Sequence, residues 1–298
     1  MQNSALIFGI TGQDGYYLRQ ICEETGVKVY GVSRTNGQWV RGDVSDAGFV
    51  DKLIDQLQCS YVFHFAAAST TRHDALYENH AAVATGTINI LEACRRHTPY
   101  ARVFLAGSAL QFENNSAPIN ERGSFAATSA YVVARNYATY AARYYRRLGL
   151  QVYIGYFFHH DSPLRSENHL SMRIVRAVQR IHHGSDERVL VSNPSVIKEF
   201  NYAGDMMEAV WLIVNQESIH ETVIGSGQGY AISDWVEICF GLVGKNCNTY
   251  LSVFDGDPIE FTSLVADPAT LVSLGWKPKV GIHELAKMMM NTWPKEKY

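Results

Sequence analysis

A tyrosine and an arginine stand four residues apart in the segment Tyr131-Val132-Val133-Ala134-Arg135. Residues at this spacing share one face of a helix, so the two side chains can meet. A cation beside a phenol favours the phenolate, which can exchange a proton with a hydroxyl group. Ser108 follows a predicted strand, where its hydroxyl could bind the same substrate oxygen. The pattern predicts a proton-transfer site of Ser108, Tyr131 and Arg135, although an ordinary pair on a helix surface has the same spacing.

Three glycines at intervals of three follow an apolar strand and open a helix. This arrangement is typical of a dinucleotide-binding turn. Gly9 permits the tight turn, Gly12 lets the backbone approach a pyrophosphate, and Gly15 lets the helix pack close to the sheet. The helix N-terminus then offers free N–H groups to phosphate. The cofactor contacts predicted here, with a bare structural turn as the alternative, are Gly9, Thr11, Gly12, Gln13, Asp14 and Gly15.

The residues after the second predicted strand indicate which dinucleotide binds. A site specific for NAD usually has Asp or Glu there, whereas this chain has Ser33 and Arg34. An arginine can pair with a 2′-phosphate, so we predict NADP in preference to NAD. A solvated surface arginine is the alternative interpretation of Arg34. Further cofactor contacts are expected at the ends of the following segments, at Asp43, Val44, Ala66 and Ala67.

Strands and helices must alternate to position these residues. The apolar runs predict strands at Ala5–Ile10, Val27–Val32, Tyr61–Phe65, Arg102–Ala106 and Val152–Phe158. Amphipathic patterns predict helices at Asp14–Glu24, Ala47–Gln58, Ala75–Arg96 and Ser129–Leu148. The alternation predicts an α/β fold, with a Rossmann-type doubly wound parallel sheet and a smaller C-terminal substrate-binding lobe.

The second half of the chain has looser alternation. Helices are predicted at Ser171–His182, Asp205–Asn215 and Ile282–Thr292. We therefore divide the chain into an NADP-binding Rossmann domain, 1–160, and a region, 161–298, that is mostly substrate-binding lobe. Part of the second region is expected to return to the Rossmann core.

The composition excludes several classes of protein. Of the 298 residues, 47% are hydrophobic and 18% charged, which is a globular composition. The net charge of -3 provides no basic field for nucleic acid. No apolar stretch approaches the roughly 18 residues of a membrane span. Five cysteines without a CxxC pair, and no signal peptide, predict reduced thiols and a cytoplasmic protein.

No metal site is predicted. The histidines occur as the adjacent pairs His159-His160 and His182-His183. Neighbouring residues on a strand point to opposite faces of the sheet, so such a pair cannot readily share one ion.

Taken together, the motifs resemble the extended short-chain dehydrogenase/reductases and, within them, the GDP-mannose 4,6-dehydratase family. The resemblance covers nearly the whole chain and includes the Gln13-Asp14 pair of the glycine loop. The segment Phe157–Arg165 is similar to the family's Phe-Asn-His-Glu-Ser-Pro-Arg-Arg segment, and Lys198-Glu199-Phe200 is similar to its Arg-Asp-Trp. Near the C-terminus, two further segments match its pattern: Leu264 with Asp267-Pro268, and Leu274-Gly275-Trp276-Lys277-Pro278.

The resemblance implies roles for individual residues. Ser108 would be the hydroxyl partner, Tyr131 the acid and base, and Arg135 the residue that holds the cofactor ribose. The implied substrate is a nucleotide sugar, most readily a GDP-hexose. Its expected contacts are Ser69, His159, Arg165 and Lys198, with Arg165 and Lys198 facing the diphosphate.

Three positions depart from the family pattern. Arg135 replaces a lysine, which keeps the charge but changes its shape. Leu110 stands where the dehydratases have a glutamate that removes the C5 proton, so that water can leave from C6. Gln111 cannot act as a base, and Glu113 lies on an uncertain loop. Asp257 falls where a phosphate-binding arginine is expected.

Three functions remain open at this stage. The first is hydride transfer at sugar C4, as a dehydratase or a 4-keto reductase, with the missing glutamate disfavouring full dehydration. The second is epimerisation at C4 or at C3 and C5, and the third is nucleotide binding by a catalytically weakened relative. The short loop after Arg34 favours a homodimer over a tetramer, with contacts through the helices near Asn79–Arg96 and Ser129–Leu148.

Overall fold

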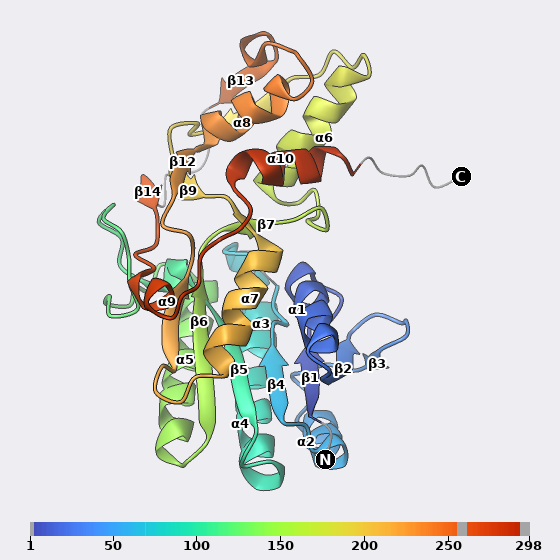
Figure 1. The fold of residues 1–298 in the computed structure, drawn as a ribbon, viewed down its shortest axis with the longest axis vertical. Helices are drawn as coiled ribbons and strands as arrows, with labels where there is room; N and C mark the ends of the chain where they lie inside the picture. The colour runs from blue at the N-terminus through green and yellow to red at the C-terminus, as the bar shows by residue number, and fades with distance from the viewer. Residues whose placement is uncertain (1–2, 69, 255–260, 293–298) are drawn as a thin grey trace.

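Seven parallel strands form the central sheet, in the order β11-β6-β5-β4-β1-β2-β3 (Figure 1). The computed structural model describes residues 3–68, 70–254 and 261–292, so Ser69 and Asp257 lie outside the described residues. The strands are β1 Ser4–Phe8, β2 Lys28–Ser33, β3 Val40–Arg41, β4 Tyr61–His64, β5 Arg102–Ser108, β6 Gln151–Phe157 and β11 Glu221–Ile224. The order reverses at β1, whose neighbours are β2 and β4. Ligands of open α/β sheets bind at such a switch point.

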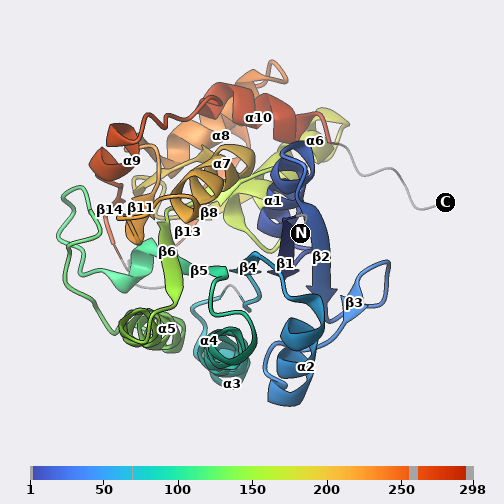
Figure 2. The same cartoon turned by 60° about the horizontal axis from the view of Figure 1, so that its bottom comes forward.

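Helices cover both faces of this sheet (Figure 2). One face carries α2 Ala47–Leu57, α4 Gly86–His97 and α5 Ala130–Arg147, and the other carries α1 Gln13–Glu24 and α7 Ala203–Val214. Strands covered on both faces must be apolar throughout, which explains the continuous hydrophobic runs of the sequence. In β1, Ala5, Leu6, Ile7 and Phe8 are all fully buried. The Rossmann-type fold predicted from the sequence is confirmed, and the observed bounds of its strands and helices differ little from the predicted ones.

The long helix predicted at Ala75–Arg96 has an irregular first half. It starts with the short helices η1 His73–Ala75 and α3 Leu76–Asn79, and a π-helical segment, η2 His80–Thr85, connects these to α4. Segments with π-helical hydrogen bonds are rare and frequently occur at functional sites.

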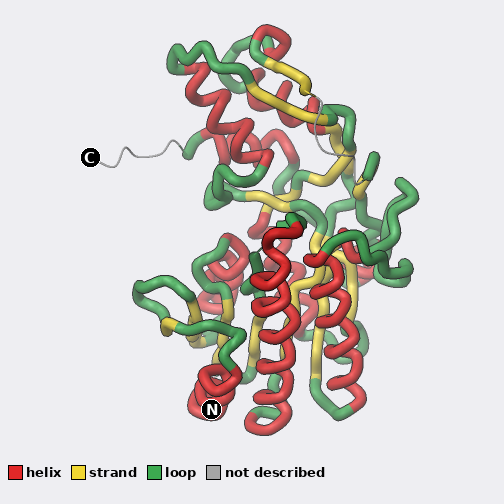
Figure 3. The backbone as a smooth tube through the Cα atoms, turned by 180° about the vertical axis from the view of Figure 1, so that it is seen from behind, coloured by secondary structure: helices red, strands yellow, loops and turns green. Residues whose placement is uncertain are grey.

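The second lobe lies above the carboxyl ends of the strands (Figures 1 and 3). Its helices, α6 Leu170–His182, α8 Ile232–Gly241 and α10 Ile282–Met290, enclose a separate core around the fully buried Trp235. Three small sheets lie beside them, in the orders β10-β7, β12-β9-β14 and β13-β8. Their strands are β7 His160–Asp161, β8 Val189–Ser192, β9 Ile197–Glu199, β10 Asn201–Tyr202, β12 Gly229–Ala231, β13 Leu251–Phe254 and β14 Ser263–Leu264. Three remaining short helices of the described residues are η3 Ala109–Gln111, which follows β5, η4 Cys247–Thr249 and α9 Ala269–Ser273.

The second half of the chain returns to the Rossmann layer and is also tied to it by hydrogen bonds. After residue 160, the chain returns to the Rossmann layer through α7, which packs on α1, and through β11, which pairs with β6. The fully buried carboxylate of Glu199 accepts hydrogen bonds from the backbone N–H groups of Ser226, Gly227 and Ala266. This carboxylate therefore fixes β9 against the segments that follow β11 and precede α9. The boundary at residue 160 stays a prediction.

Among the described residues, no helix is long and apolar enough to cross a bilayer.

Candidate active site

Two cavities meet at the carboxyl ends of the central strands. The larger one, of about 490 Å³, opens between the sheet and the second lobe, and we call it the large cavity. The smaller one, of about 320 Å³, lies over the ends of β1 and β2, and we call it the small cavity. Gly9, Gly12, Phe65 and Ala67 line both. The glycine turn is therefore the junction of the two cavities.

The glycine turn has the geometry that its sequence predicts. Gly9 has φ +89°, and a Cβ atom there would lie 2.9 Å from the backbone nitrogen of Ala66. A Cβ on Gly15 would lie 2.5 Å from the carbonyl oxygen of Gly9, which is too close for any side chain. A Cβ on Gly12 would meet only that carbonyl, at 3.4 Å. Gly12, at the N-cap of α1, thus leaves its space open toward the cavities.

The small cavity is lined by Arg34, predicted to select the cofactor, and by other residues predicted to contact it. Thr11, Arg34, Asp43, Val44, Ala66 and Ala67 all line it. Asp43 Oδ1 accepts hydrogen bonds from the backbone nitrogen and the hydroxyl of Ser45, both at 2.8 Å. The hydroxyls of Ser33 and Thr35 are 2.9 Å apart and line the same cavity. Three further groups in this cavity were not predicted from the sequence: the Ser33 hydroxyl, Thr35 and Glu78.

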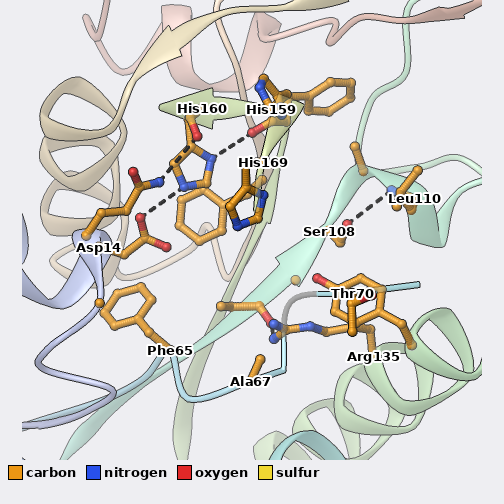
Figure 4. Close-up of a pocket in the computed structure, with 18 of the residues that line it drawn as sticks. Asp14, Phe65, Ala67, Thr70, Ser108, Leu110, Arg135, His159, His160 and His169 are labelled. Atoms are coloured by element: carbon orange, nitrogen blue, oxygen red, sulfur yellow. Dashed lines mark hydrogen bonds and ion pairs between the residues drawn. The ribbon is translucent and has the colours of Figure 1, made fainter. Parts of the chain in front are cut away.

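The structure brings Ser108, Tyr131 and Arg135 together on the lining of the large cavity. Figure 4 shows Ser108 and Arg135 there. Ser108 ends β5, and Tyr131 lies in the first turn of α5, whose N-cap Ser129 accepts a hydrogen bond from the Val132 N–H. The guanidinium carbon of Arg135 lies 5.2 Å from the centre of the Tyr131 ring. The arginine therefore lies over the face of the phenol ring.

Arg135 is held at the end of β5. It is buried, and its Nη1 donates a hydrogen bond to the carbonyl of Ala106. Its Nε has no hydrogen-bond partner among the described residues. A buried donor without a partner is costly, so this guanidinium is suited to receive acceptor groups of a ligand.

Leu110 lines the large cavity at the position where a dehydratase glutamate was expected. Gln111 turns away into the core: its Oε1 accepts from the Ser108 N–H at 2.8 Å, and its Nε2 donates to Asn136 and Thr139 at 3.1 Å. Glu113 is exposed and is absent from the lining of the cavity. Of the described residues that line it, Asp14 alone carries a carboxylate.

That carboxylate is already paired. His160 Nε2 lies 3.0 Å from Asp14 Oδ1 (Figure 4). Although burial opposes both charges, each partner favours the charged form of the other, so the pKa of Asp14 is lowered and that of His160 is raised. Gln13 contacts the same segment, because its Nε2 donates to the His160 carbonyl and its Oε1 accepts from Ser162. Gln13 and Asp14 thus dock the second lobe on α1, and their predicted contacts with a cofactor stay a prediction.

Basic side chains gather at the far end of the large cavity. His159, Arg165 and Lys198, predicted from the sequence, line it together with His169, which was not predicted. They surround the fully buried carboxylate of Asp161. His159 Nε2 lies 2.6 Å from Asp161 Oδ2, Arg165 Nε lies 3.2 Å from Oδ1, and Lys198 Nζ lies 3.4 Å from His159 Nε2. We call these five residues the basic cluster.

The basic cluster has a surplus of positive charge. Burial, and then the neighbouring Lys198 and Arg165, lower the pKa of His159 to about 4 against the pull of Asp161. Burial and Arg165 likewise lower the pKa of His169 to about 4, so both imidazoles are neutral at physiological pH. Burial and Arg165 lower the pKa of Lys198 to about 8, despite Asp161. One carboxylate therefore faces two cations, and an anion would relieve the imbalance.

The family follows from a comparison with known proteins. The family model described as GDP-mannose 4,6 dehydratase matches residues 6–289. The chain belongs to the GDP-mannose 4,6-dehydratase family. GDP-mannose 4,6 dehydratase 2 of Arabidopsis thaliana is 31% identical, over 96% of this chain and 86% of that protein. GDP-mannose 4,6-dehydratase of Vibrio cholerae is 24% identical, over 97% of this chain and 94% of that protein.

Solved structures share the fold across its full length. The dTDP-glucose 4,6-dehydratase of Bacillus anthracis in complex with NAD has a TM-score of 0.86 at 14% identity, covering 99% of this chain and 97% of that one. RMD from Pseudomonas aeruginosa complexed with NADPH has a TM-score of 0.84 at 18% identity, covering 98% and 97%. The chain is thus an NAD(P)-dependent nucleotide-sugar enzyme of the extended short-chain dehydrogenase/reductase type.

Proposed function

We propose that the protein transfers hydride between NADP(H) and C4 of a GDP-hexose without eliminating water from the sugar. One observation carries the second half of this proposal: Leu110 occupies the position of the expected base, and an alkyl side chain accepts no proton. Asp14, the carboxylate on the described lining, is engaged with His160. The C5 hydrogen of a bound hexose would therefore lack a free carboxylate base.

The cavity junction suits a nicotinamide dinucleotide. The open space at Gly12 and the N-terminus of α1 would hold the pyrophosphate. The unpartnered Nε of Arg135 would meet the nicotinamide ribose, and Arg34, with the hydroxyls of Ser33 and Thr35, would meet the 2′-phosphate. When bound, the nicotinamide supplies or accepts the hydride.

The proton would move through Tyr131, in the first turn of α5, with Ser108 at the end of β5 as its hydroxyl partner. Tyr131 gives a proton to the C4 oxygen during reduction, or takes it during oxidation, and the Ser108 hydroxyl hydrogen-bonds the same oxygen. Arg135 lies over the Tyr131 ring, where its guanidinium would also orient the phenol beside the nicotinamide ribose. The basic cluster would bind the diphosphate of the sugar nucleotide through Arg165, Lys198 and His159.

Family membership favours a second candidate, the full 4,6-dehydratase reaction. Mass analysis after incubation with GDP-hexoses distinguishes the candidates. A 4-keto sugar that gains two hydrogens in the presence of NADPH supports the reductase. Loss of one water identifies a dehydratase, and an unchanged mass with a changed sugar identifies an epimerase.

The exposed face of α5 supports a homodimer. Val133, Tyr137, Tyr140 and Tyr144, which recur at helical spacing, are 53%, 50%, 59% and 58% exposed. A second copy packed on this apolar stripe would bury it. Light scattering should therefore give the mass of a dimer for the native protein, and that of a monomer when Tyr140 and Tyr144 are both replaced by glutamate. A native monomer would contradict this assignment.

A further inference from the structure

The small cavity contains an acid that the sequence after β2 lacks. Sites for NAD usually provide a carboxylate from the end of the second strand, to bind the ribose hydroxyls. Here Glu78 enters the same cavity from α3, a different element of the fold. Its Oε1 lies 3.1 Å from both terminal nitrogens of Arg34. Glu78 and Arg34 thus lie together in the small cavity. The arginine favours a phosphorylated ribose, and the glutamate favours free ribose hydroxyls.

The backbone fixes Glu78 at this place. The next residue, Asn79, is fully buried, and its Nδ2 donates a hydrogen bond of 2.9 Å to the carbonyl of Thr70. The π-helical segment η2 follows immediately, and its residues Ala81 and Ala82 line the same cavity. Glu78 is therefore presented to the cavity by an anchored turn.

The pairing of Glu78 with Arg34 is weak enough for a ligand to replace it. The two side chains are 49% and 61% exposed, and ion pairs at such exposure contribute little because water screens them. A 2′-phosphate attracts the guanidinium but is repelled by the carboxylate. Ribose hydroxyls, in contrast, donate hydrogen bonds to a carboxylate and have no need of the arginine.

We infer that Glu78 opposes Arg34 in the choice of cofactor, so that the protein uses both NADP(H) and NAD(H), with only a small preference for the phosphorylated form. This inference rests on the proposed function, because it requires that a nicotinamide dinucleotide binds at the glycine turn. Arg34 supplies the attraction for the 2′-phosphate, and Glu78 limits that attraction and binds the unphosphorylated ribose.

The test measures the dissociation constants of NADPH and NADH by fluorescence titration of the native protein, Glu78→Gln and Arg34→Gln. Removing the negative charge should strengthen NADPH binding by about three- to tenfold and weaken NADH binding by about twofold, the scale of exposed charge interactions. Arg34→Gln should weaken NADPH binding alone. Glu284→Gln is the matched control, since it removes an exposed glutamate that is paired with Lys287 in α10.

The outcomes separate the two proposals. The inference is overturned if both cofactors bind and the ratio of NADPH to NADH affinity is the same in Glu78→Gln as in the Glu284→Gln control. The proposed function would still stand in that case. Failure of the native protein to bind either cofactor overturns both. The charge effect of Glu78→Gln should also decline as the salt concentration rises, whereas a change caused by misfolding would persist.

Discussion

Replacing Lys198 with arginine should remove the pH dependence of diphosphate binding in the alkaline range. Lys198 lines the large cavity beside His159, and burial and Arg165 lower its pKa to about 8. A bound diphosphate favours the charged lysine, so the pKa of Lys198 is higher in the complex than in the free protein. The affinity for the diphosphate is therefore at its maximum below the pKa of the free protein, and it falls as the pH rises through about 8.

The size of the loss follows from the same pKa. With a free-state pKa of about 8 and an ordinary lysine pKa of about 10.4 in the complex, affinity should fall about tenfold between roughly pH 7 and pH 9. His159 and His169, with pKa values lowered to about 4, stay neutral throughout this range. Asp161 stays ionised, because His159 and Arg165 overcome the effect of burial and lower its pKa.

Calorimetric titration with GDP-mannose checks this prediction, because its diphosphate has no group that titrates in the range. Lys198→Arg keeps its charge at any of these pH values, so its affinity should change little. Lys198→Met should bind GDP-mannose about ten- to a hundredfold more weakly than the native protein does at neutral pH, and equally weakly at every pH. This is the scale of a lost charge-assisted hydrogen bond. A native profile parallel to that of Lys198→Arg would show that Lys198 does not meet the diphosphate.

Three further predictions concern the reaction and the glycine turn. Tyr131→Phe should reduce turnover by about 10²–10⁴-fold with cofactor binding intact, and near-native activity would exclude Tyr131 as the acid and base. Leu110→Glu should introduce exchange of the C5 hydrogen with solvent deuterium and some water loss, whereas rapid C5 exchange by the native protein would reveal another base. Gly15→Ala should destabilise the fold by about 1–3 kcal/mol in thermal unfolding, because its Cβ would overlap the Gly9 carbonyl. Gly241→Ala, with open space around its Cβ and no positive φ, should be nearly neutral.

The sequence was sufficient for features that depend on local pattern. Buried parallel strands must be apolar, so β1, β4 and β5 could be read as hydrophobic runs. The glycine turn could be read because Gly9 and Gly15 each exclude a side chain for a geometric reason. Tyr131 and Arg135 could be paired because they lie one turn apart on α5.

The features that could not be predicted arise from tertiary contact. Glu78 reaches Arg34 across 44 positions of the sequence, and only the approach of α3 to the end of β2 brings them together. His169 is the N-cap residue of α6 and lines the large cavity with the rest of the basic cluster, and no motif marks it. The π-helical segment depends on hydrogen-bond register, which hydrophobic periodicity does not reveal. β11 is four residues long and pairs with a strand far earlier in the chain.

The hydrogen bonds around Gln111 decide how firmly Leu110 faces the large cavity. Gln111 closes a capping box with Ser108 at the end of β5 and also binds Asn136 and Thr139 on α5, so two elements hold its side chain in the core. A shift by one residue that moved Leu110 out of the cavity would remove the amide from these partners and leave buried polar groups unsatisfied. The contacts that hold Ser108 at the end of β5 therefore also keep Leu110 on the lining of the large cavity. In the proposed function, hydride transfer and proton removal at C5 are separable, because the hydrogen bonds that hold Ser108 do not require a carboxylate at position 110.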